Sequence, residues 1–171
     1  MITYDLLTKE IHDAFPSSEA PEKFRADYQN LQDQGLDPES HGLGDYVTVA
    51  FTYRALPWWE LLEKCINDGT LAFMVNEYVT FLDKDAWRYY VPMFLLYCID
   101  AQRRDPIMNA PGNAEFLQRQ FGDSYREAEF DKFTPQQKRC IAKVIQVVVA
   151  NISPRDNDIT PETLAYWSQY I

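Results

Sequence analysis

Few residues in this chain have the types and the spacing that catalysis or metal binding requires. The two histidines, His12 and His41, lie in different segments, and neither has a second histidine or a cysteine at metal-ligand spacing. A zinc site or a serine-histidine-aspartate triad is therefore not expected. The glycine pair Gly42 and Gly44 does not make a phosphate-binding loop either. We assign no catalytic residue, and we expect no metal ion and no cofactor.

Carboxylates are abundant and could act in pairs as general acid and base. Glu60 and Glu63 are spaced to share one helix face, and Glu127 and Asp131 are spaced similarly. With 26 acidic residues in the chain, such pairs arise by chance. Solvated surface charge is the simpler interpretation of both pairs.

Basic residues gather at Arg103 and Arg104, and again at Lys138, Arg139 and Lys143. Each group could bind an anion locally. The simpler interpretation is that they pair with carboxylates of the same chain, because lysine and arginine in the last turn of a helix also suit its dipole.

The charge of the chain limits its partners. The 171 residues carry a net charge of −10, which argues against nucleic acid, since phosphate binding needs lysine and arginine. Residues 1–80 hold 14 acidic and 5 basic side chains, whereas residues 81–171 hold 12 and 11. The acidic half is either a solvated surface that favours solubility or a surface complementary to a basic protein partner. For the second interpretation, the expected partner-binding residues are Asp33, Asp37, Glu39, Asp45, Glu60 and Glu63.

The cysteines and the N-terminus indicate the compartment. Cys65, Cys98 and Cys140 are odd in number and widely spaced, so we expect reduced thiols in the core of a cytoplasmic protein. No secretory signal is evident at the N-terminus. The longest apolar run, residues 91–99, is much shorter than the roughly 20 residues of a membrane span. No contact with a membrane is expected.

The pattern of apolar residues predicts an all-α fold, a compact helical bundle in one domain over residues 1–171. Helices are expected at residues 4–14, from Pro21 to before Gly35, at 57–66 and from 83 onward, and shorter ones near 114–121 and 125–130. Thr134-Pro135 and Thr160-Pro161 are typical helix starts. Residues 36–45 form a loop. A helix is favoured at 46–53, but alternation there and the apolar run 71–75 leave a short β-hairpin open.

The segment from Phe81 to Tyr97 combines a helix cap at Asp83, several aromatic rings and Pro92. It is apolar almost all round, which predicts a central helix surrounded by other elements. Pro92 lacks a backbone donor and crowds the preceding turn, so a kink near Arg88 and Tyr89 is expected.

Part of this segment resembles a known signature. The motif Phe81-Leu82-x-x-x-Ala86-Trp87-Arg88-Tyr89-Tyr90-x-Pro92-x-Phe94-Leu95 is similar to that of an uncharacterised family of small, acidic bacterial proteins. Trp59-Glu60-Leu61 and Phe133-Thr134-Pro135-Gln136-Gln137 extend the resemblance to about residues 45–150. This chain has tryptophan where phenylalanine is common. The resemblance implies a bacterial cytosolic origin and an all-α fold, and it brings no activity with it.

Two classes of function follow from these observations. The first is a protein-binding module, most concretely an immunity protein or antitoxin that occludes a toxic enzyme with its acidic surface. The alternatives are a regulatory adaptor or a small enzyme with a dispersed site of carboxylates and tyrosines. A polar pocket that contains His41, Tyr89 or Tyr90 would favour the enzyme.

Overall fold

A computed structural model describes residues 3–36, 44–122 and 127–171. All regular structure in these ranges is helical, which confirms the all-α fold, and the optional β-hairpin is not formed there. The helices are α1 (Tyr4–Ala14), α2 (Glu22–Asp33), α3 (Asp45–Tyr53), α4 (Trp58–Asn67), α5 (Gly69–Tyr78), the 3-10 helix η1 (Val79–Phe81), α6 (Lys84–Arg104), α7 (Pro106–Phe121), α8 (Glu127–Phe130), α9 (Pro135–Ala150) and α10 (Pro161–Ser168).

The two segments that were ambiguous in sequence are both helical. In α3 the buried side chains Val49, Ala50 and Tyr53 recur at intervals of one, three and four residues, as on one helix face. In α5 the Asp68 carboxylate caps the first turn by accepting from the backbone N–H groups of residues 70 and 71. α5 packs against both α3 and α4, so these helices bury one another's apolar faces.

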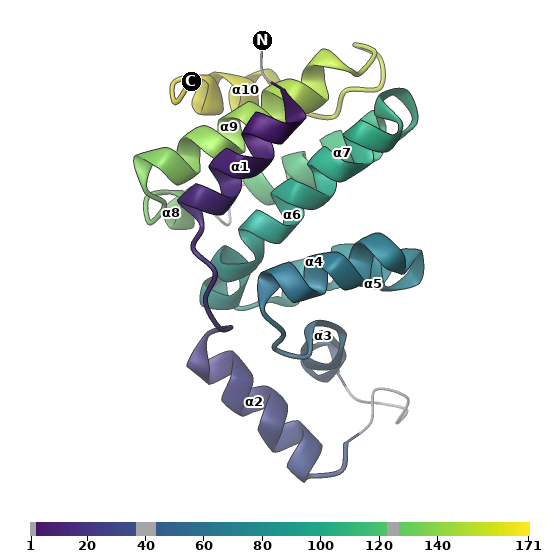
Figure 1. Ribbon diagram of the computed structural model, residues 1–171, viewed down its shortest axis with the longest axis vertical. Helices are drawn as coiled ribbons and strands as arrows, with labels where there is room; N and C mark the ends of the chain where they lie inside the picture. The colour runs from purple at the N-terminus through teal and green to yellow at the C-terminus, as the bar shows by residue number, and fades with distance from the viewer. Residues whose placement is uncertain (1–2, 37–43, 123–126) are drawn as a thin grey trace. The chain divides into compact units, whose positions relative to one another are not determined.

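The chain divides into two compact units, and α6 begins in one and ends in the other. One unit comprises residues 1–16 and 95–171, where α9 packs against α1, α7 and α10 (Figure 1). The other comprises residues 17–94, where α3 packs against α2 and α5. The expectation of a single domain stays a prediction.

Helix α9 organises the unit made of residues 1–16 and 95–171. Its start is the expected capping box, in which Thr134 Oγ1 accepts from the Gln137 N–H and Gln137 Oε1 accepts from the Thr134 N–H. The Gln137 amide also donates to the backbone carbonyl of Ala14 at 3.1 Å, which joins the start of α9 to the end of α1. The β-branched residues of α9 face the core at helical spacing, so packing outweighs their preference for strands.

Helix α7 is longer than the sequence indicated. The sequence predicted a short helix near residues 114–121, but the helix already starts at Pro106. Asp105 caps it by accepting from the Met108 N–H at 3.1 Å, and proline at the first position loses no hydrogen bond. The Asn109 amide then donates to the Ala101 carbonyl at 2.8 Å, so contacts with α6 support this turn.

Helix α6 confirms the prediction of a buried central helix. Trp87, Tyr90 and Val91 are fully buried, and Asp83 caps the helix by accepting from the Ala86 N–H at 2.8 Å. The helix continues through Pro92, and the kink itself stays a prediction.

All three cysteines are buried and free, as expected. Burial raises the pKa of the Cys65 and Cys98 thiols to about 12 and that of Cys140 to about 11. These thiols are therefore protonated at neutral pH and poorly reactive in the folded chain. Within the described ranges, no helix combines the length and apolar character of a membrane span.

Candidate functional site

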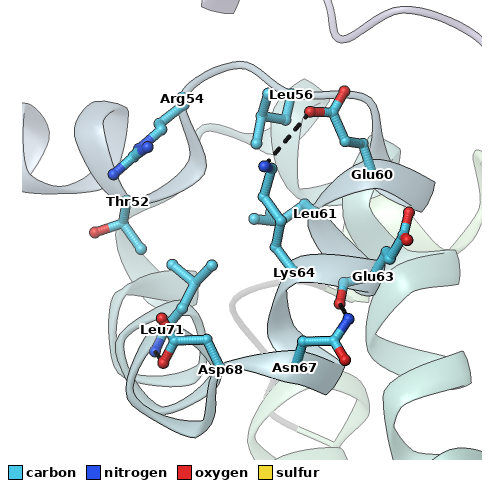
Figure 2. A pocket seen from close by; sticks show the side chains of 10 residues that line it. All are labelled: Thr52, Arg54, Leu56, Glu60, Leu61, Glu63, Lys64, Asn67, Asp68 and Leu71. Carbon is cyan, nitrogen blue, oxygen red and sulfur yellow. Dashed lines mark hydrogen bonds and ion pairs between the residues drawn. The ribbon is translucent and has the colours of Figure 1, made fainter.

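The candidate site is a surface pocket of about 600 Å³ within residues 17–94. It lies between the end of α3, the loop of residues 54–57, α4 and the first turn of α5 (Figure 2). Ligand pockets typically enclose about 300–1,000 Å³, so the volume suits a small molecule or a side chain. The lining residues are Thr52, Arg54, Leu56, Glu60, Leu61, Glu63, Lys64, Asn67, Asp68 and Leu71.

A strained turn forms the edge of the pocket. Arg54 and Ala55 both have left-handed backbone conformations, with φ of 52° and 48°. Neither is glycine, and this conformation costs an L residue roughly 1–2 kcal/mol. The turn ends α3 with a hydrogen bond from the Arg54 N–H to the Ala50 carbonyl at 2.7 Å. Pro57 then directs the chain into α4, so Arg54 and Leu56 reach the pocket from a short, sharply bent connection.

Two tyrosines of the signature segment hold this connection in place. The Tyr90 hydroxyl donates to the Leu56 carbonyl at 2.8 Å. The Tyr89 hydroxyl accepts from the Trp58 N–H at 3.3 Å and donates to the Ser18 carbonyl. Burial raises the pKa of both hydroxyls, so they remain protonated donors. These tyrosines position backbone, and neither of them lines the pocket.

A third tyrosine connects two walls of the pocket. The hydroxyl of Tyr53, at the end of α3, donates to the Val75 carbonyl of α5 at 2.8 Å. Next to it in sequence, Thr52 is 4% exposed, and its hydroxyl has no hydrogen-bond partner among the described residues. An unsatisfied buried hydroxyl is unfavourable, and such groups are uncommon in native proteins.

The pocket carries charges of both signs. Glu60 and Lys64 lie one turn apart on α4, with their charged groups 3.8 Å apart. Asp68 uses one carboxylate oxygen to cap α5. The Glu63 carboxylate makes no ion pair with any described residue, and Figure 2 shows it directed away from Lys64 and Leu71.

Glu63 also belongs to an exposed surface on the outer side of α4. Trp59 and Ile66 are 38% and 39% exposed, and they lie four residues before and three residues after Glu63. These spacings put all three side chains on one face of the helix. Trp58, the residue before Trp59, is buried, and its ring packs edge-to-face on that of Trp59 with ring centroids 5.8 Å apart. We refer to Trp59, Glu63 and Ile66 as the α4 outer face.

The structure brings together only part of the predicted partner-binding set. Glu60 and Glu63 share the pocket. Asp33 lies exposed in the last turn of α2, where the Gln29 amide donates to it at 2.8 Å, and Asp45 lies exposed in the first turn of α3. The remaining members of the set, Asp37 and Glu39, lie outside the described residues, as does His41.

Sequence reasoning missed the two cations of the pocket, Arg54 and Lys64. They are ten positions apart and do not form a cluster, so local spacing does not connect them. Their rarity was the available signal, because residues 17–94 contain only six basic side chains beside 13 acidic ones. An isolated cation in an acidic segment is therefore a candidate ligand contact.

Four of the five basic residues in the two clusters form ion pairs, as the simpler interpretation predicted, whereas Arg139 is exposed and forms none with a described residue. Arg103 pairs with a carboxylate of α1 at 2.7 Å, and Arg104 pairs within α6 at 2.9 Å. Lys138 lies 3.5 Å from the Asp131 carboxylate, and Lys143 pairs with α1 at 2.5 Å. Among the described residues, no group of three or more His, Cys, Asp or Glu side chains could hold a metal ion.

Comparison with known proteins identifies a family. Residues 5–171 match the family described as "Family of unknown function (DUF6714)", and the chain belongs to this family. The match agrees with the expectation of an uncharacterised family. No curated protein and no solved structure matches the chain.

Proposed function

We propose that this member of a family of unknown function is a protein-binding module that recognises a basic partner. Most concretely, it would be a cytoplasmic bacterial immunity protein or antitoxin that occludes a toxic enzyme. The observation that carries the proposal is the α4 outer face, where the unpaired carboxylate of Glu63 lies between the exposed apolar side chains of Trp59 and Ile66. Binding hot spots commonly combine an aromatic anchor with a charge that is satisfied only in the complex.

The charge distribution supports the same proposal. Residues 17–94 carry a net charge of −7, and residues 1–16 with 95–171 carry −3. Four exposed carboxylates of the first group make neither an ion pair nor a hydrogen bond within the described part of the chain; they are Glu22, Asp45, Glu63 and Glu77. A surface with unpaired negative charge accelerates association with a basic protein, and the acceleration falls as salt rises.

The test compares two variants with the same loss of charge. The first neutralises the described members of the predicted set, with Asp33→Asn, Asp45→Asn, Glu60→Gln and Glu63→Gln. The control neutralises four exposed carboxylates of the other unit, with Glu115→Gln, Asp156→Asn, Asp158→Asn and Glu162→Gln.

Each variant is co-expressed with toxic enzymes encoded beside the gene, and growth is measured together with complex formation at low and high salt. We expect the wild type and the control to protect the cells and to bind the enzyme. The first variant should lose protection and association. If that variant protects as well as the control, or if the wild type protects against none of the neighbouring enzymes, the proposal is wrong.

A further inference from the structure

The basic side chains within residues 17–94 differ in how they are paired. Three of them form close ion pairs, which are Lys23 with Asp27, Arg25 with Glu19, and Arg88 with Asp85. Lys84 also interacts with a partner. In contrast, the Lys64 ammonium lies 3.8 Å from its nearest described carboxylate, which is beyond hydrogen-bond distance. Arg54 makes one side-chain hydrogen bond, from Nε to the Phe51 carbonyl at 3.3 Å. Both cations therefore keep unused N–H donors among the described residues.

These two incompletely paired cations line the same pocket. Figure 2 shows Arg54 at the end of α3 with its guanidinium turned toward Thr52, and Lys64 on α4 with its ammonium group turned toward Glu60. Two positive charges that line one pocket repel each other, and an anion that binds near both is attracted to both. The free guanidinium and ammonium donors can each form charge-assisted hydrogen bonds to such an anion.

The rest of the lining restricts the kind of anion. Leu56 and Leu71 are partly exposed and supply an apolar surface, and Leu61 of the same lining is fully buried. Carboxylates of Glu60, Glu63 and Asp68 belong to the same lining, and they would repel a dianion such as phosphate. They would attract an ammonium group instead. A ligand that carries one carboxylate, one ammonium group and an apolar chain is complementary to all three features.

We propose that this pocket binds a free α-amino acid with an apolar side chain. Its carboxylate would lie between Arg54 and Lys64, its ammonium group beside the Glu60 or Asp68 carboxylate, and its side chain against the leucines. The volume of about 600 Å³ accommodates such a molecule. The two proposals share Glu60 and Glu63, which line the pocket, but their tests are distinct, because this one measures binding of a free amino acid and depends on Arg54 and Lys64.

The experiment titrates the purified full chain with L-leucine and L-phenylalanine and follows backbone amide shifts by NMR. Two leucine analogues separate the contributions of the ligand's two charged groups to binding. L-leucinamide lacks the carboxylate, and 4-methylpentanoate lacks the ammonium group. We expect saturable shifts at Arg54 and Lys64 with the amino acids, weaker binding of 4-methylpentanoate and none of leucinamide. Leucinamide binding as tight as leucine binding, or no saturable shift with either amino acid, overturns the proposal.

Variants identify the two cations as ligand contacts. Arg54→Gln and Lys64→Gln should each weaken amino-acid binding by about tenfold or more, since each removes a charge-assisted hydrogen bond. Lys23→Gln is the matched control, because it removes an exposed cation of the same unit that is already paired and lies outside the pocket lining. Thermal melting verifies that all three variants fold. Unchanged affinity in Lys64→Gln contradicts the proposal, and so does an equal loss in the control.

Discussion

The Tyr90 hydroxyl donates a 2.8 Å hydrogen bond to the Leu56 carbonyl, which joins the buried central helix to the connection that borders the pocket. Tyr90 is fully buried and packs on the ring of Tyr53 with centroids 4.8 Å apart. Part of the signature segment therefore shapes the pocket by holding its backbone. Its tyrosines are positioning residues for Leu56 and Trp58.

Replacement of Tyr90 by phenylalanine should measure this support. The Tyr90→Phe variant keeps the ring but leaves the partly buried Leu56 carbonyl without the hydroxyl donor, which should cost about 0.5–1.5 kcal/mol in the free energy of unfolding. Tyr89→Phe should cost less, because the Tyr89 side chain is only half-buried and water can reach its partners. Urea unfolding of the three proteins provides the comparison. An equal stability of wild type and Tyr90→Phe would show that the bond does not hold the connection.

The left-handed conformation of Arg54 predicts that glycine is more stable than alanine at this position. Both Arg54→Gly and Arg54→Ala lose the guanidinium and its bond to Phe51, but only glycine adopts a φ of 52° without strain. The Gly variant should exceed the Ala variant by about 1 kcal/mol in the free energy of unfolding. Urea denaturation measures the difference. Equal stabilities would indicate that the backbone relaxes to another conformation.

Capping chemistry explains why much of the fold was predictable from sequence. Thr134 and Thr160 start α9 and α10 as expected, since these helix starts depend on side chains within three residues of the cap. The start of α7 carries a local signal of the same kind, Asp105 before Pro106, and it was missed because Pro111 and Gly112 follow so closely. The helix continues through Pro111, where the Asn109 amide donates to the Ala101 carbonyl of α6 at 2.8 Å.

The candidate site was predictable only in part. Glu60 and Glu63 were identified because they share a helix, and their spacing alone puts them on neighbouring turns. Arg54, Lys64 and Leu71 come from different elements, and the packing of α3, α4 and α5 brings them to one pocket. The left-handed backbone conformation of Arg54 could not be predicted from the sequence either, because glycine or asparagine usually occupies such a position.

Gly122 should be intolerant of a side chain for a steric reason. A Cβ atom there would lie 2.1 Å from the Gln118 amide nitrogen and 2.5 Å from Thr163 Oγ1. Gln118 is not free to move without cost, because its Oε1 accepts from the Thr160 N–H at 3.0 Å, at the cap of α10. Gly122→Ala should therefore destabilise the chain by about 1–3 kcal/mol in thermal or urea unfolding.

A double-mutant cycle separates this clash from a general effect of the substitution. In a Gln118→Ala background much of the crowding around Gly122 is removed. The added cost of Gly122→Ala should then fall by about 1 kcal/mol, as expected for residues in direct contact. Fully additive effects on the free energy of unfolding would contradict the steric explanation.

The buried thiols predict a loss of stability at alkaline pH. Burial raises the pKa of Cys65 and Cys98 to about 12 from a usual value of 9.0, so the folded chain binds these protons more tightly than the unfolded chain. Their contribution is complete below pH 9 and is lost as pH rises from 9 toward 12, because only the unfolded chain ionises in this window. Urea unfolding at pH 8 and at pH 9.5 should show the decrease. The decrease should be smaller in a variant with both cysteines replaced by alanine, and an identical pH dependence would assign the effect to other groups.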